Sequence, residues 1–92
     1  METTLRGPYP NPFDQKPMHE YVLSESQEVT IEIYDVLGRR IRTLVDGQKE
    51  AGRHTIQWNG GSRYETEIGS GMYFCRMRAA DETVTKKMVR VR

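Results

Sequence analysis

The sequence has little of what many small secreted or metal-binding domains rely on. It holds one cysteine, Cys75, among 92 residues, so no internal disulfide and no thiolate metal cluster can form, and packing alone must hold the fold together. No apolar run approaches the roughly 18 residues that a membrane span needs, and residues 1–6 lack the pattern of a secretion signal. We expect no membrane insertion, in a chain that either acts where it is made or was cut from a longer secreted protein.

A deep active-site cleft is excluded by the length of the chain. The 92 residues are 36% hydrophobic and 29% charged, which leaves a thin core. A chain of this size buries only about 60 to 70% of its unfolded surface, so it cannot enclose a cleft and still keep a hydrophobic centre. The length therefore predicts one domain and excludes a multi-domain enzyme.

A strong excess of positive charge is also missing. Fourteen basic residues face thirteen acidic ones, for a net charge of +1, whereas dedicated nucleic-acid binders usually carry a clear basic excess. The two halves differ: residues 1–46 hold five basic and eight acidic residues, 5 − 8 = −3, and residues 47–92 hold nine and five, 9 − 5 = +4. We expect no nucleic-acid partner, and two differently charged surfaces.

All four prolines fall near the N-terminus, at positions 8, 10, 12 and 17. Proline fixes φ and lacks a backbone donor, so this stretch is extended and is neither helix nor central strand. We assign residues 1–8 to an extended N-terminal lead-in or linker and residues 9–92 to the folded domain. Tyr9 and Phe13 are the expected anchors of this segment on the domain.

After the prolines, apolar residues alternate with a period of two, and turn residues interrupt them every eight to twelve positions. In the third of these segments, over residues 39–45, Leu44 falls on the face opposite Val45, which indicates a bulge or a thin second contact, and loops are expected between Asp46 and Gly52 and over residues 59–71. The pattern predicts an all-β fold, an antiparallel immunoglobulin-like β-sandwich of six to seven strands. The clearest inward rows are Val29, Ile31 and Ile33; His54, Ile56 and Trp58; and Tyr73, Cys75 and Met77.

The residues that could carry chemistry favour structural roles. Cys75 alternates with core residues, and His19 and His54 lie in strand segments, so we expect a buried apolar cysteine and two half-buried structural histidines rather than a nucleophile and its base. The spacing of these residues fits no zinc site, and no acidic calcium loop is present. The glycine pairs open no helix that could cradle a phosphate. We predict no enzyme activity, no metal and no cofactor. The serines considered as nucleophiles are Ser24, Ser26, Ser62 and Ser70.

Short motifs occur along the chain in a fixed order. They are Tyr9-Pro10-Asn11-Pro12-Phe13, Tyr21 with Leu23, Ile33-Tyr34-Asp35-Val36-Leu37-Gly38-Arg39, Leu44, Ala51-Gly52-Arg53-His54, Trp58-Asn59-Gly60, Ser70-Gly71-Met72-Tyr73-Phe74 and Lys87-Met88-Val89. In order and spacing they resemble the type A C-terminal sorting domains of the type IX secretion system, over about residues 9–92. The related immunoglobulin-like domain of the flagellar hook-capping protein is similar in much of this pattern.

The resemblance implies a non-catalytic sorting module at the end of an exported protein, read by the outer-membrane translocation machinery and commonly removed by a sortase that attaches the cargo to a surface glycolipid. Its protein partner is expected to recognise the C-terminal strand, whose cations could meet an acidic groove and whose edge could pair with another sheet. The expected recognition residues are Lys86, Lys87, Met88, Val89, Arg90, Val91 and Arg92. The positions with an expected structural role are Pro10, Asn11, Pro12, Phe13, Tyr34, Asp35, Gly38, Gly52, Trp58, Gly60, Gly71 and Tyr73.

Two other functions remain open at this point. The chain could be a structural, self-associating immunoglobulin-like module, a possible homo-oligomer in a hook cap, a surface filament or a virion. It could also be a carbohydrate-binding accessory domain that uses the loop around Tyr64 as its platform.

Overall fold

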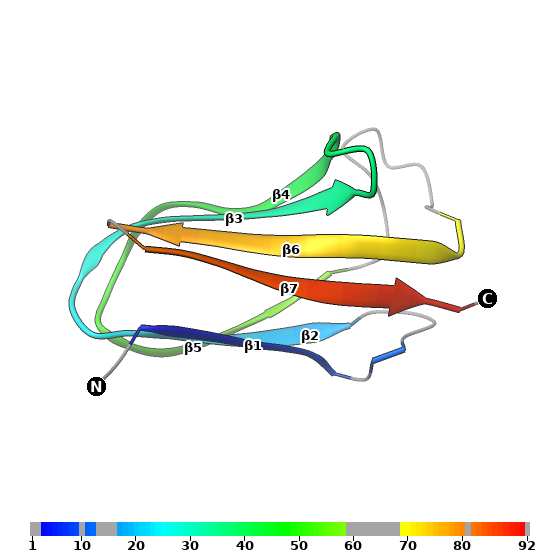
Figure 1. Ribbon diagram of the computed structural model, residues 1–92. Coiled ribbons are helices and arrows are strands. Elements are labelled where there is room, and N and C mark those ends of the chain that lie inside the picture. The colour runs from blue at the N-terminus through cyan, green and yellow to red at the C-terminus, as the bar shows by residue number, and fades with distance from the viewer. Residues whose placement is uncertain (1–2, 10, 13–16, 59–68, 81, 92) are drawn as a thin grey trace.

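The computed structural model describes residues 3–9, 11–12, 17–58, 69–80 and 82–91. Two antiparallel sheets face each other, and Figure 1 shows them as two layers. One has the strand order β1-β2-β5 and the other the order β4-β3-β6-β7. The predicted antiparallel immunoglobulin-like sandwich is confirmed, with seven strands. They are β1 (Thr4–Tyr9), β2 (Met18–Leu23), β3 (Gln27–Asp35), β4 (Arg40–Lys49), β5 (Gly52–Gln57), β6 (Gly71–Ala79) and β7 (Glu82–Arg90).

The core forms where the inward rows of the two sheets meet. On the larger sheet Ile31 lies opposite Met77 and Ile33 opposite Cys75, and all four side chains are fully buried. Trp58, 1% exposed, follows β5 and is the largest buried side chain. Burying each large apolar side chain contributes about 1.5 to 3 kcal/mol, so these rows explain why period-two segments of this chain become the two layers of a sandwich. The smaller sheet contributes Leu5, Tyr21 and Leu23 to the same core.

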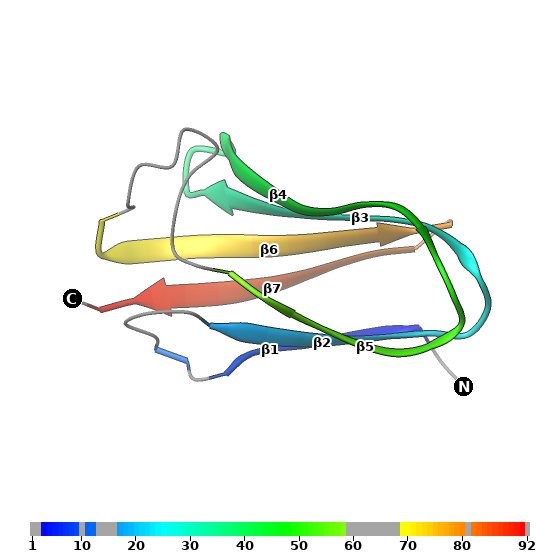
Figure 2. The same ribbon diagram turned by 180° about the vertical axis from the view of Figure 1, so that it is seen from behind.

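Strand β4 carries two irregularities. Ile31 pairs with Val45 while the next residue of β3 pairs with Thr43, so Leu44 is an extra residue. A second shift of the same kind leaves Ile41 unpaired. Of the two alternatives expected at Leu44 the structure shows the bulge, and both extra residues pack partly against the core. The loop predicted to begin at residue 46 is wrong: β4 continues to Lys49, and Figure 2 shows it leading into β5 of the other sheet.

The N-terminal segment belongs to the sandwich. Residues of the expected lead-in form β1, an edge strand paired with β2, and Leu5 is 2% exposed in the core. The domain therefore starts before residue 9, where the sequence placed its boundary. Tyr9 is 59% exposed, so its expected role as an anchor is wrong; Phe13, the other expected anchor, lies outside the described residues. Leu5 anchors instead because, on a strand, every second side chain faces the core.

Strand β1 approaches β2 closely at Gly7. Gly7 has a φ of +111°, and a Cβ atom at this position would lie 2.8 Å from the carbonyl oxygen of Met18 and 3.0 Å from Cδ2 of His19. Only glycine satisfies both the positive φ and the lack of space. The described residues include no helix long and apolar enough to cross a membrane.

Candidate functional site

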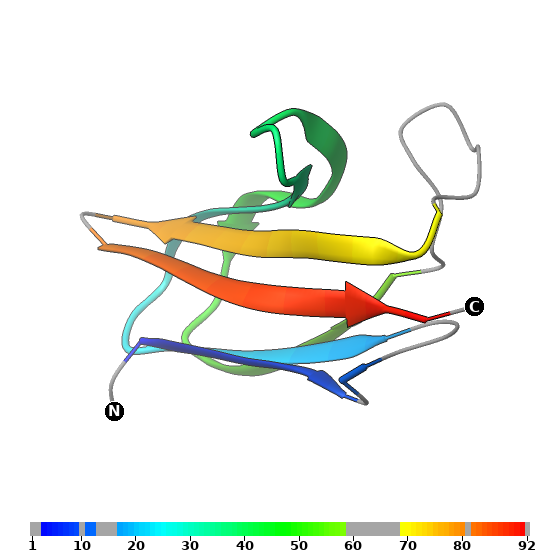
Figure 3. The same cartoon turned by 45° about the vertical axis from the view of Figure 1, so that its right-hand side comes forward.

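Strand β7, expected to carry recognition, is an edge strand. It pairs with β6 on one side and lies beside β1 of the other sheet, as Figures 1 and 3 show. An edge strand presents backbone N–H and C=O groups that a further strand could bind. The C-terminal strand therefore occupies the kind of position that recognition by strand addition requires.

The structure divides the expected recognition residues into two groups. Lys86 and Lys87 are exposed, and Val91 is 52% exposed. Met88 is fully buried in the core and Arg90 is 3% exposed. Side chains of this set therefore do not all face the same side of the strand, because alternate side chains of a strand point to opposite faces. Val89 is half-buried, and Arg92 lies outside the described residues.

The two exposed lysines point in opposite directions. Lys86 lies opposite Cys75, whose side chain faces the core, and Lys87 lies opposite Phe74 on the outer face. The charge of the strand is thus spread over both sides of the sheet edge. A partner that adds a strand here would meet one ammonium group on each face.

Asn11 connects the N-terminal motif to this edge. Its Nδ2 donates to the carbonyl oxygen of Lys87 at 3.3 Å, and its Oδ1 accepts from the backbone N–H of Val89 at 3.1 Å. Because both groups point away from β6, the side-chain amide takes the place that a residue of a neighbouring strand would occupy. Asn11 therefore covers part of the edge that carries the expected signal.

Two further motif positions hold the end of the sandwich together. The rings of Trp58 and Tyr73 pack edge to face, with centroids 6.4 Å apart. The hydroxyl of Tyr73 donates to the carbonyl oxygen of Gly69 at 2.9 Å. The backbone N–H of Trp58 donates to the carbonyl oxygen of Pro17 at 3.1 Å. Through these contacts Trp58 and Tyr73 join the end of β5 to the start of β6.

The turn between β3 and β4 is built on Asp35. Its Oδ1 accepts from the backbone N–H groups of Leu37 and Arg39, both at 2.9 Å, and its Oδ2 accepts from Nε of Arg39 at 2.8 Å. These bonds, that from the Arg39 backbone foremost, lower the pKa of the Asp35 carboxyl. Gly38 completes the turn with a φ of +81°.

The remaining motif positions are spread over the domain. Gly52 and Gly71 also have positive φ, and Pro12 is exposed. Pro10, Phe13 and Gly60 lie outside the described residues.

A polar cluster on the outer face of the larger sheet was not predicted. Glu32, only 7% exposed, accepts from the hydroxyl of Tyr34 at 2.8 Å and from Nη1 of Arg40 at 3.1 Å. Burial alone would raise the pKa of this carboxyl, but these bonds and a longer one from Thr43 outweigh burial and lower it. The sequence indicated only that Glu32 points outward. Its partners lie on β3 and β4, and no local sequence pattern predicts that they meet.

The family model of the FlgD Ig-like domain matches residues 13–83. The chain belongs to this family. No curated protein matches the chain. A FlgD-type immunoglobulin-like domain is a structural rather than a catalytic domain type.

Solved structures share the fold of this FlgD-type domain. Dimeric latent PorU from Porphyromonas gingivalis matches 97% of the chain at 24% identity with a TM-score of 0.73, over 9% of PorU. FlgD from P. aeruginosa matches 78% of the chain at 20% identity with a TM-score of 0.61, over 57% of FlgD. PorZ matches 98% of the chain at 17% identity with a TM-score of 0.60, over 11% of PorZ. It is described as an essential bacterial surface component of the type-IX secretion system of Porphyromonas gingivalis. The chain thus spans only a part of each.

The side chains considered for catalysis have structural surroundings in this FlgD-type domain. Cys75 is fully buried, and burial raises the pKa of its thiol to about 12, so it stays protonated. His54 stacks on Tyr21 with ring centroids 4.8 Å apart, and its Nε2 donates to the carbonyl oxygen of Glu50 at 2.8 Å. Both side chains have the packing roles that the sequence predicts.

His19 differs from Cys75 and His54 in its polar contacts. Its ring is fully buried, neither nitrogen has a hydrogen-bond partner among the described residues, and burial lowers the pKa of the imidazole to about 4. The sequence predicted a half-buried structural histidine here, whereas the ring is fully buried. Ser24, Ser26 and Ser70 are exposed, and Ser62 lies outside the described residues.

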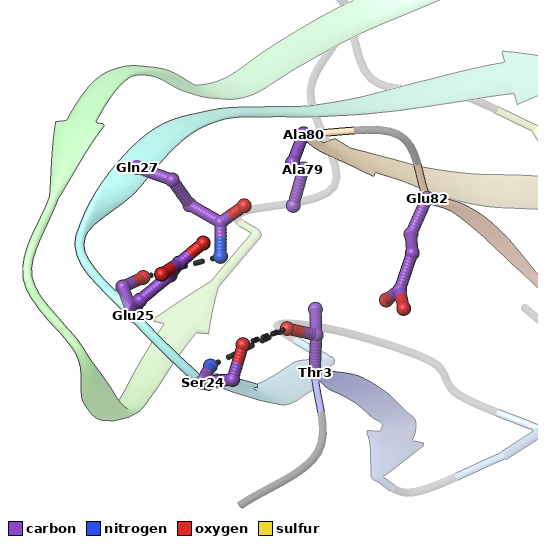
Figure 4. A pocket seen from close by; sticks show the side chains of 7 residues that line it. All are labelled: Thr3, Ser24, Glu25, Gln27, Ala79, Ala80 and Glu82. Carbon is purple, nitrogen blue, oxygen red and sulfur yellow. Dashed lines mark hydrogen bonds between the residues drawn. The ribbon is translucent and has the colours of Figure 1, made fainter.

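The described residues include a small polar pocket between the start of β1 and the β6–β7 turn (Figure 4). Its volume is about 180 Å³, below the roughly 300 to 1,000 Å³ of typical ligand sites. Thr3 and Ser24 bond to each other in its wall, and Gln27 bonds to the backbone of Glu25. No group of three potential metal ligands occurs among the described residues.

Proposed function

We propose that this FlgD-type immunoglobulin-like domain is a sorting module that directs a passenger protein across an outer membrane to the cell surface. The observation that carries the proposal is the place of β7: the strand marked by the resemblance as a signal lies at a sheet edge, with Lys86 and Lys87 exposed. The ordered motif set and the fold shared with PorZ support the same proposal. The loop around Tyr64, which is the platform of the carbohydrate-binding alternative, falls within residues 59–68, outside the described residues.

Recognition would join backbone pairing to charge. The bonds to Asn11 show that the backbone C=O of Lys87 and N–H of Val89 point away from β6. Thr83 and Thr85 lie at the same alternate positions of the strand, so their backbone groups also face away from the sheet. A strand of the translocation machinery that pairs with this edge would gain main-chain hydrogen bonds, and acidic side chains beside it would meet Lys86 and Lys87. Main-chain pairing tolerates different sequences, which suits a signal shared by many passengers.

The test is charge reversal on β7. The chain is fused to the C-terminus of an exported reporter in a bacterium with a type IX secretion system, and Lys86→Glu with Lys87→Glu is compared with the unchanged chain. We expect the reporter to accumulate in the periplasm, because a negative edge repels an acidic partner. Deleting the strand would be less informative, because it removes Met88 from the core.

The matched control is Lys49→Glu with Arg53→Glu, which makes the same change of charge on β4 and β5. Arg53 forms only a long, exposed ion pair of 3.7 Å with Glu20, which contributes little to stability. Circular dichroism melts establish that both variants fold. Normal surface delivery of the folded β7 variant, or equal retention of the control, would contradict the proposal.

A second candidate function follows from the family itself. FlgD-type domains are structural, and FlgD is matched over more than half of its length, so the chain could be a self-associating scaffold subunit. Sedimentation velocity on the purified chain separates the two: stable higher oligomers at micromolar concentration favour a scaffold, and a monomer favours sorting.

A further inference from the structure

The outer face of the larger sheet carries a cavity that is separate from the outward edge of β7. Its volume is about 330 Å³, within the range of ligand sites. Tyr34 lies opposite Phe74, and Arg76 lies opposite Thr85, so two adjacent rows of the sheet supply its floor. The β3–β4 turn forms its side. The lining residues used below are Tyr34, Phe74, Arg76, Thr85 and Val36.

Arg76 is held in place but has no carboxylate partner among the described residues. Its Cζ lies 4.7 Å from the centroid of the Tyr34 ring, a cation–π contact that orients the guanidinium. The nearby carboxylates are already occupied: Glu32 accepts from Tyr34 and Arg40, and Asp35 is paired with Arg39. The N–H groups of Arg76 therefore remain able to bind an incoming anion, and guanidinium binds carboxylates with two parallel hydrogen bonds.

Aliphatic surface lies beside this cation. Val36 is 63% exposed in the wall of the cavity, and the next residue, Leu37, is 73% exposed. Phe74 adds a half-buried aromatic wall. A ligand that fills the cavity would thus meet a positive charge and apolar side chains within one small volume.

We propose that this cavity binds an acidic peptide segment of a partner protein, with a carboxylate on Arg76 and a neighbouring aliphatic side chain against Val36 and Phe74. A sugar fits less well, because sugars stack on open aromatic faces and the guanidinium of Arg76 already lies over the Tyr34 ring. The proposal holds whether the domain sorts a passenger or builds a scaffold.

The test uses the full 92-residue chain, labelled with ¹⁵N, and capped eight-residue peptides. One peptide alternates Glu with Leu, and a second has Gln in place of every Glu. We expect the Glu peptide to shift the amide signals of Tyr34, Val36, Phe74 and Arg76, and the Gln peptide to leave them unchanged. Equal binding of the two peptides, or no shift at these positions, would overturn the proposal.

Two variants of β6 provide the matched comparison. Arg76→Gln removes the cation of the cavity and should weaken binding roughly ten- to a hundredfold, because the charge-assisted hydrogen bonds to the peptide carboxylate are lost. Arg78→Gln removes the same charge two residues further along the same face, outside the cavity, and should change binding less than about twofold. Equal losses in both variants would show attraction by general charge and overturn the site.

A third variant and a third ligand complete the design. Val36→Ser removes an exposed aliphatic group without touching the core and should weaken binding about threefold, because apolar contact equivalent to about 0.65 kcal/mol is lost. An oligogalacturonate with the same number of carboxylates tests the alternative ligand class. If it binds more tightly than the Glu peptide, the ligand is an acidic glycan and the proposal is wrong.

Discussion

Asn11 and Val89 are 78 positions apart in the chain, yet the side-chain oxygen of Asn11 accepts the backbone N–H of Val89 at 3.1 Å. The same amide donates to the carbonyl oxygen of Lys87. One side chain thereby fastens the N-terminal segment to the last strand and occupies part of an otherwise open sheet edge, which limits unwanted pairing. Access to the edge of β7 and the attachment of the N-terminal segment are therefore linked.

Asn11→Ala should loosen this link. Two hydrogen bonds at the surface are lost, so we expect the free energy of unfolding in urea to fall by about 1 kcal/mol. The uncovered edge should also increase self-association, measured by sedimentation at several concentrations. Asn11→Asp keeps the acceptor for Val89 but loses the donor to Lys87 and should fall in between. An unchanged stability in both variants would show that the contact contributes nothing.

His19 should make stability depend on pH between about 6.5 and 4. Its pKa in the folded domain is lowered from 6.5 to about 4, so the unfolded chain binds the proton more readily. The contribution is complete above pH 6.5 and is lost as pH falls, by about 3 kcal/mol at pH 4. Urea midpoints from pH 7.5 to 4 measure the loss. His19→Leu should flatten the curve in this window, and the same slope in both proteins would refute the role of His19.

Glu32 should act at lower pH than His19, and its folded pKa is lowered as well. Because its folded pKa is lowered, its contribution is complete above the unfolded value near 4.5 and is lost as pH falls through the folded value. Glu32→Gln should lower the unfolding free energy at pH 7 by about 1 to 2 kcal/mol, and this difference should shrink in acid. A double-mutant cycle with Tyr34→Phe measures the coupling of the pair; a coupling of zero would contradict the 2.8 Å bond.

Two glycines should respond differently to alanine. Gly7→Ala places a Cβ 2.8 Å from a backbone oxygen at a φ of +111°, and we expect a loss of more than about 3 kcal/mol or no folding. Gly38→Ala meets no atom within 4 Å and should cost only about 1 kcal/mol for its positive φ. Thermal melts of both variants compare them; equal losses would mean that the close approach of β1 to β2 is unimportant.

Much of the larger sheet could be predicted from local pattern. The alternation of Val29, Ile31 and Ile33 marks an inward row, and the misplaced Leu44 marks a bulge, because both depend only on near neighbours in the chain. The N-terminal strand could not be read this way. Its apolar pattern is interrupted by glycine and proline, only Leu5 and Pro8 of its described residues are buried, and the large Tyr9 is exposed to solvent.

The candidate sites show the same division. The sequence by itself determined a thin, disulfide-free sandwich and the structural nature of Cys75, since composition and a period of two decide which side chains can be buried. Only the tertiary structure decided that Met88 turns inward while Lys87 stays exposed, that Asn11 reaches the edge of β7, and that Arg76 stands over Tyr34 beside an open cavity. These contacts depend on how strands that are distant in the sequence pack together, and the local spacing of residues along the chain does not determine that packing.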